Sequence, residues 1–196
     1  MADTTQTALA VFDRALNAFT ELVHAVPKDG WSAPTPCDDW DTRALVNHVT
    51  VEHLWAKPML AGQTIAEVGD QFDGDVLGAQ PDIIWDGAAS ASRSAFHGPD
   101  ALSATVHSSM GDEPAMQYLD EMTFDLLVHG WDLGQAIGRP TPWDDSSVDL
   151  LQRMAQHFAP MAADLVAAGV MGPALKVGDD ADAQTRLLAG FGRSPG

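Results

Sequence analysis

Apolar residues recur at helical spacing along most of the chain. In the first segment, steps of three and four residues separate Leu9, Phe12, Leu16, Phe19 and Val23. Such a set lies on one face of an α-helix. The pattern predicts a helix from about residue 4 to residue 26, where the sequence Pro-Lys-Asp-Gly interrupts it.

The same periodicity predicts helices over residues 41–60, 81–96, 115–137 and 146–168. Asp41 stands where an N-cap is expected, and Trp40 and Leu45 have the spacing of a hydrophobic staple. A glycine- and acid-rich loop is expected over residues 69–78. Strand signal is weak. It is confined to Thr105 and Val106 and to a short stretch of the tail.

Long amphipathic helices with little strand signal predict an all-α protein built as a helical bundle. We expect residues 1–170 to form this bundle and residues 171–196 to form a C-terminal tail that packs on the same domain. Helical bundles build ligand and metal sites from side chains on facing helices. Polar residues on the buried faces are therefore the first place to look for function.

Composition and charge argue against several classes of partner and site. The chain has 196 residues, of which 45% are hydrophobic, and carries a formal net charge of −18. Such a surface repels phosphate backbones and anionic lipid, so no nucleic-acid or membrane partner is expected. No apolar run reaches membrane-spanning length and the N-terminal segment is acidic, which favours a cytoplasmic protein. Cys37 is the only cysteine, so we expect neither an internal disulfide nor a zinc-thiolate cluster, and a structural role for Cys37.

Polar residues interrupt the buried stripe of the helix predicted over residues 115–137. One face carries Tyr118, Met122, Asp125, His129, Asp132 and Ala136, and Glu121 lies on nearly the same line. Asp125 and His129 are one turn apart and can reach a common point. Burying such groups is costly unless something satisfies them.

The helix predicted over residues 41–60 shows the same anomaly. His48 and Glu52 lie one turn apart on its most apolar face. The neighbouring His53 is rotated away from that face and is predicted to point into solvent. Two helices thus each offer a histidine and a carboxylate from a face that should be buried.

A divalent metal between the two helices would satisfy these groups together. Two histidines and a carboxylate form a common zinc site when a further position is left for water or substrate, and the same set suits iron or nickel. The alternative is ordinary, because a histidine and an acid one turn apart often form a surface pair or a satisfied polar contact.

Three fragments carry a family resemblance: TPCDDWDTRALVNHV, FDLLVHGWDLGQAIGRP and the closing RLLAGFGRSPG. Together they resemble the DinB-like metal-binding superfamily, and within it the actinobacterial branch related to mycothiol-dependent maleylpyruvate isomerase. The resemblance implies a four-helix bundle with additional short helices and a divalent metal held by His48, Asp125 and His129. Aspartate at position 125 is one methylene shorter than the glutamate of the isomerase, so it sits closer to the metal or reaches it through water.

The resemblance also implies chemistry with a low-molecular-weight thiol, mycothiol, on a small electrophilic substrate, through S-transfer or isomerisation. In that scheme Asp132 orients His129 or a bound water, and Glu52 is a general acid or base. A homodimer is a further expectation from similar proteins. Maleylpyruvate itself is not the expected substrate, because only a short tail follows the bundle. A metal-dependent hydrolase, and a non-catalytic metal- or thiol-binding module linked to stress, remain alternatives.

Overall fold

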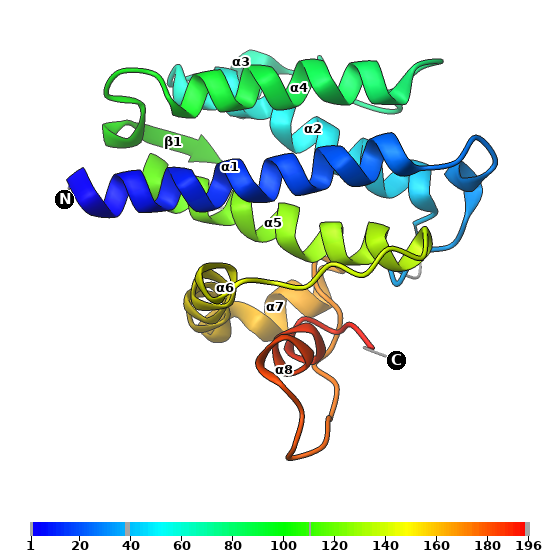
Figure 1. Cartoon of the computed structure of the whole chain (residues 1–196). Coiled ribbons are helices and arrows are strands. Elements are labelled where there is room, and N and C mark those ends of the chain that lie inside the picture. Colours follow the sequence, from blue (N-terminus) through cyan, green and yellow to red (C-terminus); the bar gives the residue numbers. More distant parts are fainter. Residues whose placement is uncertain (1, 38–39, 110, 195–196) are drawn as a thin grey trace.

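Four long helices form the body of the protein in this computed structural model, which describes residues 2–37, 40–109 and 111–194. They are α1 (Ala2–Ala25), α2 (Thr42–Leu60), α4 (Pro81–Phe96) and α5 (Ala115–Ala136). Helix α1 packs against α4 and α5, and α2 packs against the same two helices, so the four close into a bundle (Figure 1). The all-α bundle predicted from periodicity is confirmed, with helix bounds that agree to within a few residues.

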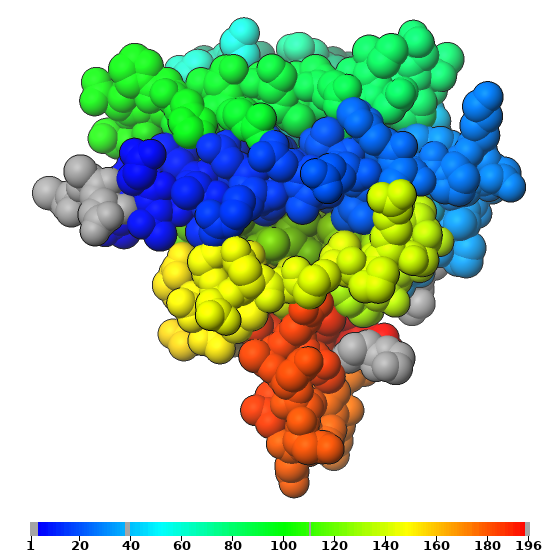
Figure 2. Space-filling model, in the orientation of Figure 1, coloured from blue at the N-terminus to red at the C-terminus, as the bar shows by residue number. Residues whose placement is uncertain are grey.

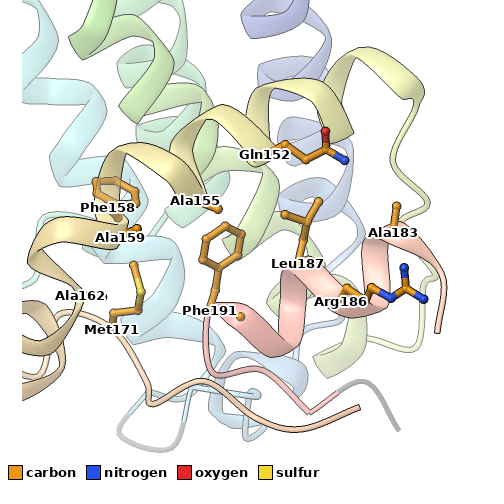
Figure 3. A pocket seen from close by; sticks show the side chains of 11 residues that line it. Gln152, Ala155, Phe158, Ala159, Ala162, Met171, Ala183, Arg186, Leu187 and Phe191 are labelled. Carbon is orange, nitrogen blue, oxygen red and sulfur yellow. The ribbon is translucent and has the colours of Figure 1, made fainter. Parts of the chain in front are cut away.

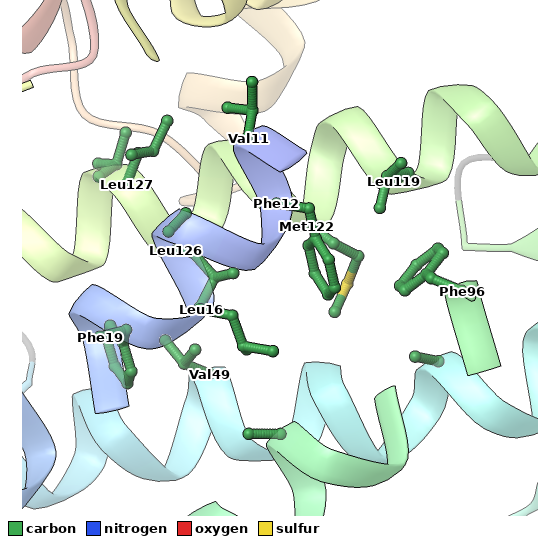
Figure 4. Packing of buried hydrophobic residues seen from close by; sticks show 14 of the residues in the cluster. Val11, Phe12, Leu16, Phe19, Val49, Phe96, Leu119, Met122, Leu126 and Leu127 are labelled. Carbon is green, nitrogen blue, oxygen red and sulfur yellow. The ribbon is translucent and has the colours of Figure 1, made fainter. Parts of the chain in front are cut away.

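The core lies where the faces of these helices meet. Phe12, Leu16 and Phe19 of α1 point toward α5 and α2 (Figure 4) and are almost fully buried. The Phe12 ring meets Phe96 of α4 edge-on, with ring centroids 5.1 Å apart. Val49 of α2 is also fully buried in this cluster. Interlocking of large apolar side chains from four elements fixes how the helices face one another.

Short elements connect the long helices. A 3-10 helix η1 (Gly30–Ser32) follows α1, α3 (Ile65–Val68) follows α2, and η2 (Ala101–Ser103) follows α4. Strands β1 (Thr105–Ser108) and β2 (Gly111–Pro114) pair antiparallel. The extended structure expected at Thr105 and Val106 is confirmed. Its partner strand is only four residues long and contains Gly, Asp and Pro, which gives little strand signal.

The C-terminal quarter adds a smaller layer against α5. It comprises α6 (Asp145–Phe158), η3 (Ala159–Met161), α7 (Ala162–Ala167) and α8 (Ala183–Gly190). The prediction of a single helix over residues 146–168 is wrong, because the structure has two helices, α6 and α7, joined by the 3-10 turn η3. Pro160 lies in this turn and has no N–H to continue the α-helical hydrogen bonds. The strand suggested in the tail does not form among its described residues. Figure 2 shows the segment before α8 projecting from the bundle.

The expectation that His53 faces solvent is wrong. Its side chain is 1% exposed and its Nδ1 lies 2.8 Å from the Ser92 hydroxyl of α4. Helix α2 packs on α4 and α5 at once, so two of its faces are buried rather than one. Burial lowers the pKa of His53 to about 3, which keeps the imidazole neutral.

Among the described residues, no helix combines the length and apolar character needed to span a membrane.

Candidate metal centre

The start of α2 sets the position of His48. The carboxylate of Asp41 accepts a hydrogen bond from the Ala44 N–H at 2.8 Å, so the predicted N-cap is confirmed. The chain before it is held by a bridge between Pro34 and Asp41. The Trp40 indole packs over the His48 ring, with centroids 4.6 Å apart. His48 therefore leaves α2 nearly two turns after a well-fixed helix start, with one ring face covered.

The structure brings His48, Asp125 and His129 together at one point between α2 and α5. The Nε2 atom of His48 lies 3.3 Å from Oδ2 of Asp125. The Nε2 atom of His129 lies 3.3 Å from Oδ1 of the same carboxylate. One ligand atom from each residue falls within 4.8 Å of the other two. These are the three residues that spacing and resemblance single out.

The polar atoms of this group fit a divalent cation. Oδ2 of Asp125 is buried and accepts no hydrogen bond among the described residues. Burial would raise the pKa of Asp125, but the two imidazoles outweigh it and hold the pKa well below the usual range. An ionised carboxylate and two histidine nitrogens facing a single point are the donors that zinc, iron and nickel take.

A second polar cluster lies behind His129. The Nδ1 atom of His129 is 3.0 Å from Oδ2 of Asp132, whose side chain is fully buried. The Arg193 guanidinium donates to the same oxygen at 2.9 Å. The Cys37 thiol donates to it at 3.2 Å. Despite burial, bonds from His129 and Arg193 lower the pKa of Asp132.

Cys37, His129 and Asp132 make a second group with metal-ligand spacing. The Arg193 Nη2 lies 3.0 Å from the Cys37 sulfur, so a permanent positive charge already faces this group. Cys37, for which the sequence predicts a structural role, is therefore hydrogen-bonded within a polar cluster. Sequence reasoning does not find Arg193, because 61 positions separate it from Asp132 and no local pattern marks the pair.

A cavity of about 730 Å³ opens over His48, Asp125 and His129. Glu52 and Glu121 line it, and the C-terminal segment supplies the facing wall, including Met171, Phe191 and Arg193. Burial and the charge of Asp125 raise the pKa of Glu52. Burial, reinforced by the neighbouring Glu113, raises the pKa of Glu121 to about 7. Two carboxyl groups that hold protons more tightly than usual thus face the space above the candidate metal ligands.

A second, more apolar cavity of about 450 Å³ lies between α6, α7 and α8 (Figure 3). It shares Phe158, Met171 and Phe191 with the first cavity. These three residues therefore border both spaces.

Four other arginines, which would be the natural partners of an acidic substrate, lie away from this cavity. Arg43 pairs with Asp75, and Arg93 with Asp13. Arg153 lies 3.5 Å from Asp120. Neither these three nor Arg139 lines the cavity above the candidate metal ligands. The guanidinium of Arg193 does line it, but Asp132, Cys37 and the Phe191 carbonyl already engage its nitrogens.

Comparison with known proteins agrees with this geometry. Residues 12–134 match the family described as the mycothiol maleylpyruvate isomerase N-terminal domain. An uncharacterised protein of Mycobacterium tuberculosis strain CDC 1551 / Oshkosh is 31% identical over 140 residues, covering 69% of this chain and 70% of the relative. An uncharacterised protein of strain ATCC 25618 / H37Rv matches to the same extent. No solved structure matches the chain significantly.

The matched region contains α2 and α5 almost entirely, and with them His48, Asp125, His129 and Asp132. Arg193 lies beyond it. The four-helix bundle, the paired histidines and this match lead to one conclusion: the chain belongs to the mycothiol maleylpyruvate isomerase N-terminal domain family of the DinB-like metal-binding superfamily.

Proposed function

We propose that this protein binds a divalent metal through His48, Asp125 and His129 and uses it with a low-molecular-weight thiol, such as mycothiol, to act on a small electrophilic substrate. Zinc is the first candidate for the metal, with nickel and iron as alternatives. The observation that carries the proposal is the convergence of three donor side chains from two helices at the floor of a cavity of about 730 Å³. Three protein ligands beneath open space are typical of catalytic rather than purely structural sites.

A divalent cation held there would lower the pKa of a coordinated thiol and supply a thiolate at neutral pH. The side chains around the three donors could orient a ligand, transfer a proton and provide an apolar wall. Asp132 accepts from His129 and orients its ring. Glu52 lies one turn after His48 on the cavity wall, with a raised pKa, and is placed to hold or release a proton at its carboxyl group. The Trp40 and Phe124 rings cover part of the cavity with apolar surface.

The charges on the cavity wall bear on the substrate. Among the described residues that line the cavity, Arg193 is the one cationic side chain apart from the two histidines. Its guanidinium is already paired with Asp132. Glu52 and Glu121 add negative charge on the wall. A dicarboxylate such as maleylpyruvate would find no free arginine there, so a neutral or cationic substrate fits better.

Metal content of three purified untagged proteins tests the donor set: wild type, His48→Ala and Cys37→Ala. We expect stoichiometric metal in wild type and Cys37→Ala and a large loss in His48→Ala. The reverse pattern would assign the metal to Cys37, His129 and Asp132 instead. Substitution of His129 does not separate the two groups, because both contain it. Metal retained in full by both variants would remove both assignments.

Cobalt substitution then tests the thiol. Adding a thiol to the cobalt protein should change its visible bands through thiolate coordination. Unchanged bands at saturating thiol would contradict the thiol-dependent reaction and favour water as the nucleophile, as in a hydrolase. Bands indicating full coordination by protein alone would favour a non-catalytic metal-binding module.

A further inference from the structure

We infer that Arg193, a residue of the C-terminal segment outside the matched family region, is a positioning residue of the metal centre that acts on His129 through Asp132. The inference rests on the metal centre proposed above. It extends the centre from the two helices of the bundle to a third, distant part of the chain.

The contact between Arg193 and Asp132 is the first step of the argument. Nη2 of Arg193 lies 2.9 Å from Oδ2 of Asp132, and Nε lies 3.3 Å from both carboxylate oxygens. The Asp132 side chain is fully buried and that of Arg193 is 11% exposed. A carboxylate in this position needs a paired cation, because an isolated buried charge is strongly unfavourable.

The second step joins Asp132 to the metal ligand. Oδ2 of Asp132 also accepts from Nδ1 of His129 at 3.0 Å, while Nε2 of His129 faces Asp125. A carboxylate on one ring nitrogen fixes the tautomer and orientation of a histidine and leaves the other nitrogen free for a metal. Arg193 thus fixes the Asp132 carboxylate, which in turn orients His129.

The third step concerns how Arg193 itself is held. Its backbone N–H donates to the Leu188 carbonyl at 2.8 Å, which ties it to the end of α8. Its Nη1 donates to the Phe191 carbonyl at 3.0 Å, and Nη2 reaches the Cys37 sulfur at 3.0 Å. All three guanidinium nitrogens are therefore engaged in a fixed arrangement. Arginine, with a planar set of donors, suits this geometry better than lysine.

The same segment also walls the cavity. Gly169, Val170 and Pro173 line it from the stretch that follows α7, and Gly192 and Arg193 line it from the stretch that follows α8. Without this segment the space above His48, Asp125 and His129 would lose one of its walls. The C-terminal segment consequently completes the metal centre in two ways, by orienting one ligand and by enclosing the space above it.

The test compares wild type with Arg193→Gln, Arg193→Lys and the control Arg186→Gln. Arg186 lies on α8 and donates to the Asp179 carbonyl, away from the metal ligands. Zinc affinity is measured by competition with a chromophoric chelator. Loss of an outer partner of a metal-binding histidine typically weakens affinity roughly 10- to 100-fold. We expect a loss of this size for Arg193→Gln, a smaller one for Arg193→Lys, and wild-type affinity for Arg186→Gln.

A second readout does not depend on metal. In the metal-free protein, the Nδ1 proton of His129 should give a downfield NMR signal through its bond to Asp132, and Arg193→Gln should shift or broaden it. Thermal unfolding of each variant identifies any that fails to fold. If Arg193→Gln does not fold, Arg193→Lys is compared with wild type in its place. If Arg193→Gln folds, binds zinc within twofold of wild type and keeps the His129 signal, the inference is overturned. If wild type binds no metal, the proposed function fails, and the NMR comparison still decides whether Arg193 positions His129.

Discussion

Gly192 and Gly172 lie in direct backbone contact: a Cβ placed on Gly192 would come within 2.6 Å of the Gly172 Cα. Gly192 also has a φ of +79°, which disfavours any residue with a side chain. Two irregular stretches of the C-terminal segment meet at this point, next to Arg193. The crossing is narrow enough that only glycine fits without displacing backbone.

The first prediction follows from that contact. Gly192→Ala should lower the free energy of unfolding by about 1–3 kcal/mol and weaken zinc binding, because the displaced backbone moves Arg193 away from Asp132. Gly190→Ala is the matched control, since a Cβ added at that position would meet no atom within 4 Å. Urea unfolding and chelator competition measure the two effects. Equal behaviour of the two alanine variants would contradict the role assigned to the crossing.

The second prediction concerns pH and His53. The pKa of this buried imidazole is about 3 in the folded protein, against about 6.5 for an exposed histidine. The unfolded chain therefore takes up the proton first as pH falls. The stability due to neutral His53 is complete above pH 6.5 and declines between pH 6.5 and 3, by at most about 1.4 kcal/mol per pH unit.

Comparison with His53→Leu isolates this contribution, because leucine does not titrate. The free energy of unfolding of wild type should fall relative to the variant between pH 6 and pH 4. Urea unfolding at four pH values checks it. A difference between the two proteins that stays constant over this range would show that His53 does not remain neutral in the folded state.

The third prediction tests charge selection in the cavity. Cysteamine, 2-mercaptoethanol and 3-mercaptopropionate are thiols of similar size with positive, neutral and negative ends. At pH 8 Glu121, with a pKa of about 7, is mostly ionised. The cobalt protein should bind cysteamine more tightly than 3-mercaptopropionate.

Glu121→Gln is the matched variant for this comparison. It should reduce the preference for cysteamine about threefold to fivefold, the effect of losing one partly solvated ion pair. Titration of the visible cobalt bands gives the dissociation constants. A preference for 3-mercaptopropionate in wild type would indicate that the cavity selects anions.

The fourth prediction concerns the start of α2. Asp41→Ala should destabilise the protein by about 1 kcal/mol, since the Ala44 N–H loses its side-chain acceptor. Asp41→Asn keeps an acceptor oxygen and should retain most of the stability. Thermal unfolding of both variants checks the order. A loss in Asp41→Asn as large as that in Asp41→Ala would show that charge rather than the cap dominates.

Much of the bundle is predictable from sequence because it depends on local periodicity. The spacing of Phe12, Leu16 and Phe19 is enough to orient α1, and the Asp41 cap marks the start of α2. The pairing of Asp125 with His129 is also local, since one turn separates them. Their convergence with His48 follows only once two helices are assumed to face each other, which the family resemblance supplies.

The remaining features depend on contacts between distant parts of the chain. His53 is buried because α2 packs against helices on two sides. The hydrophobic pattern of α2 alone does not show this second neighbour. Arg193 reaches Asp132 across the fold, and its sequence context is an ordinary Gly-Arg-Ser. The interruption at Pro160 is a different case, because the proline is visible in the sequence and its effect on a helix is general.

The wall shared by the two cavities has a consequence for ligand size. Phe158, Met171 and Phe191 line both the space above the candidate metal ligands and the apolar space between α6 and α8. Methionine has three rotatable bonds and adapts its shape at low cost. A change of rotamer at Met171 would alter the shape of both spaces without moving any helix, so this side chain bears on the size of the ligand that fits above the two imidazoles.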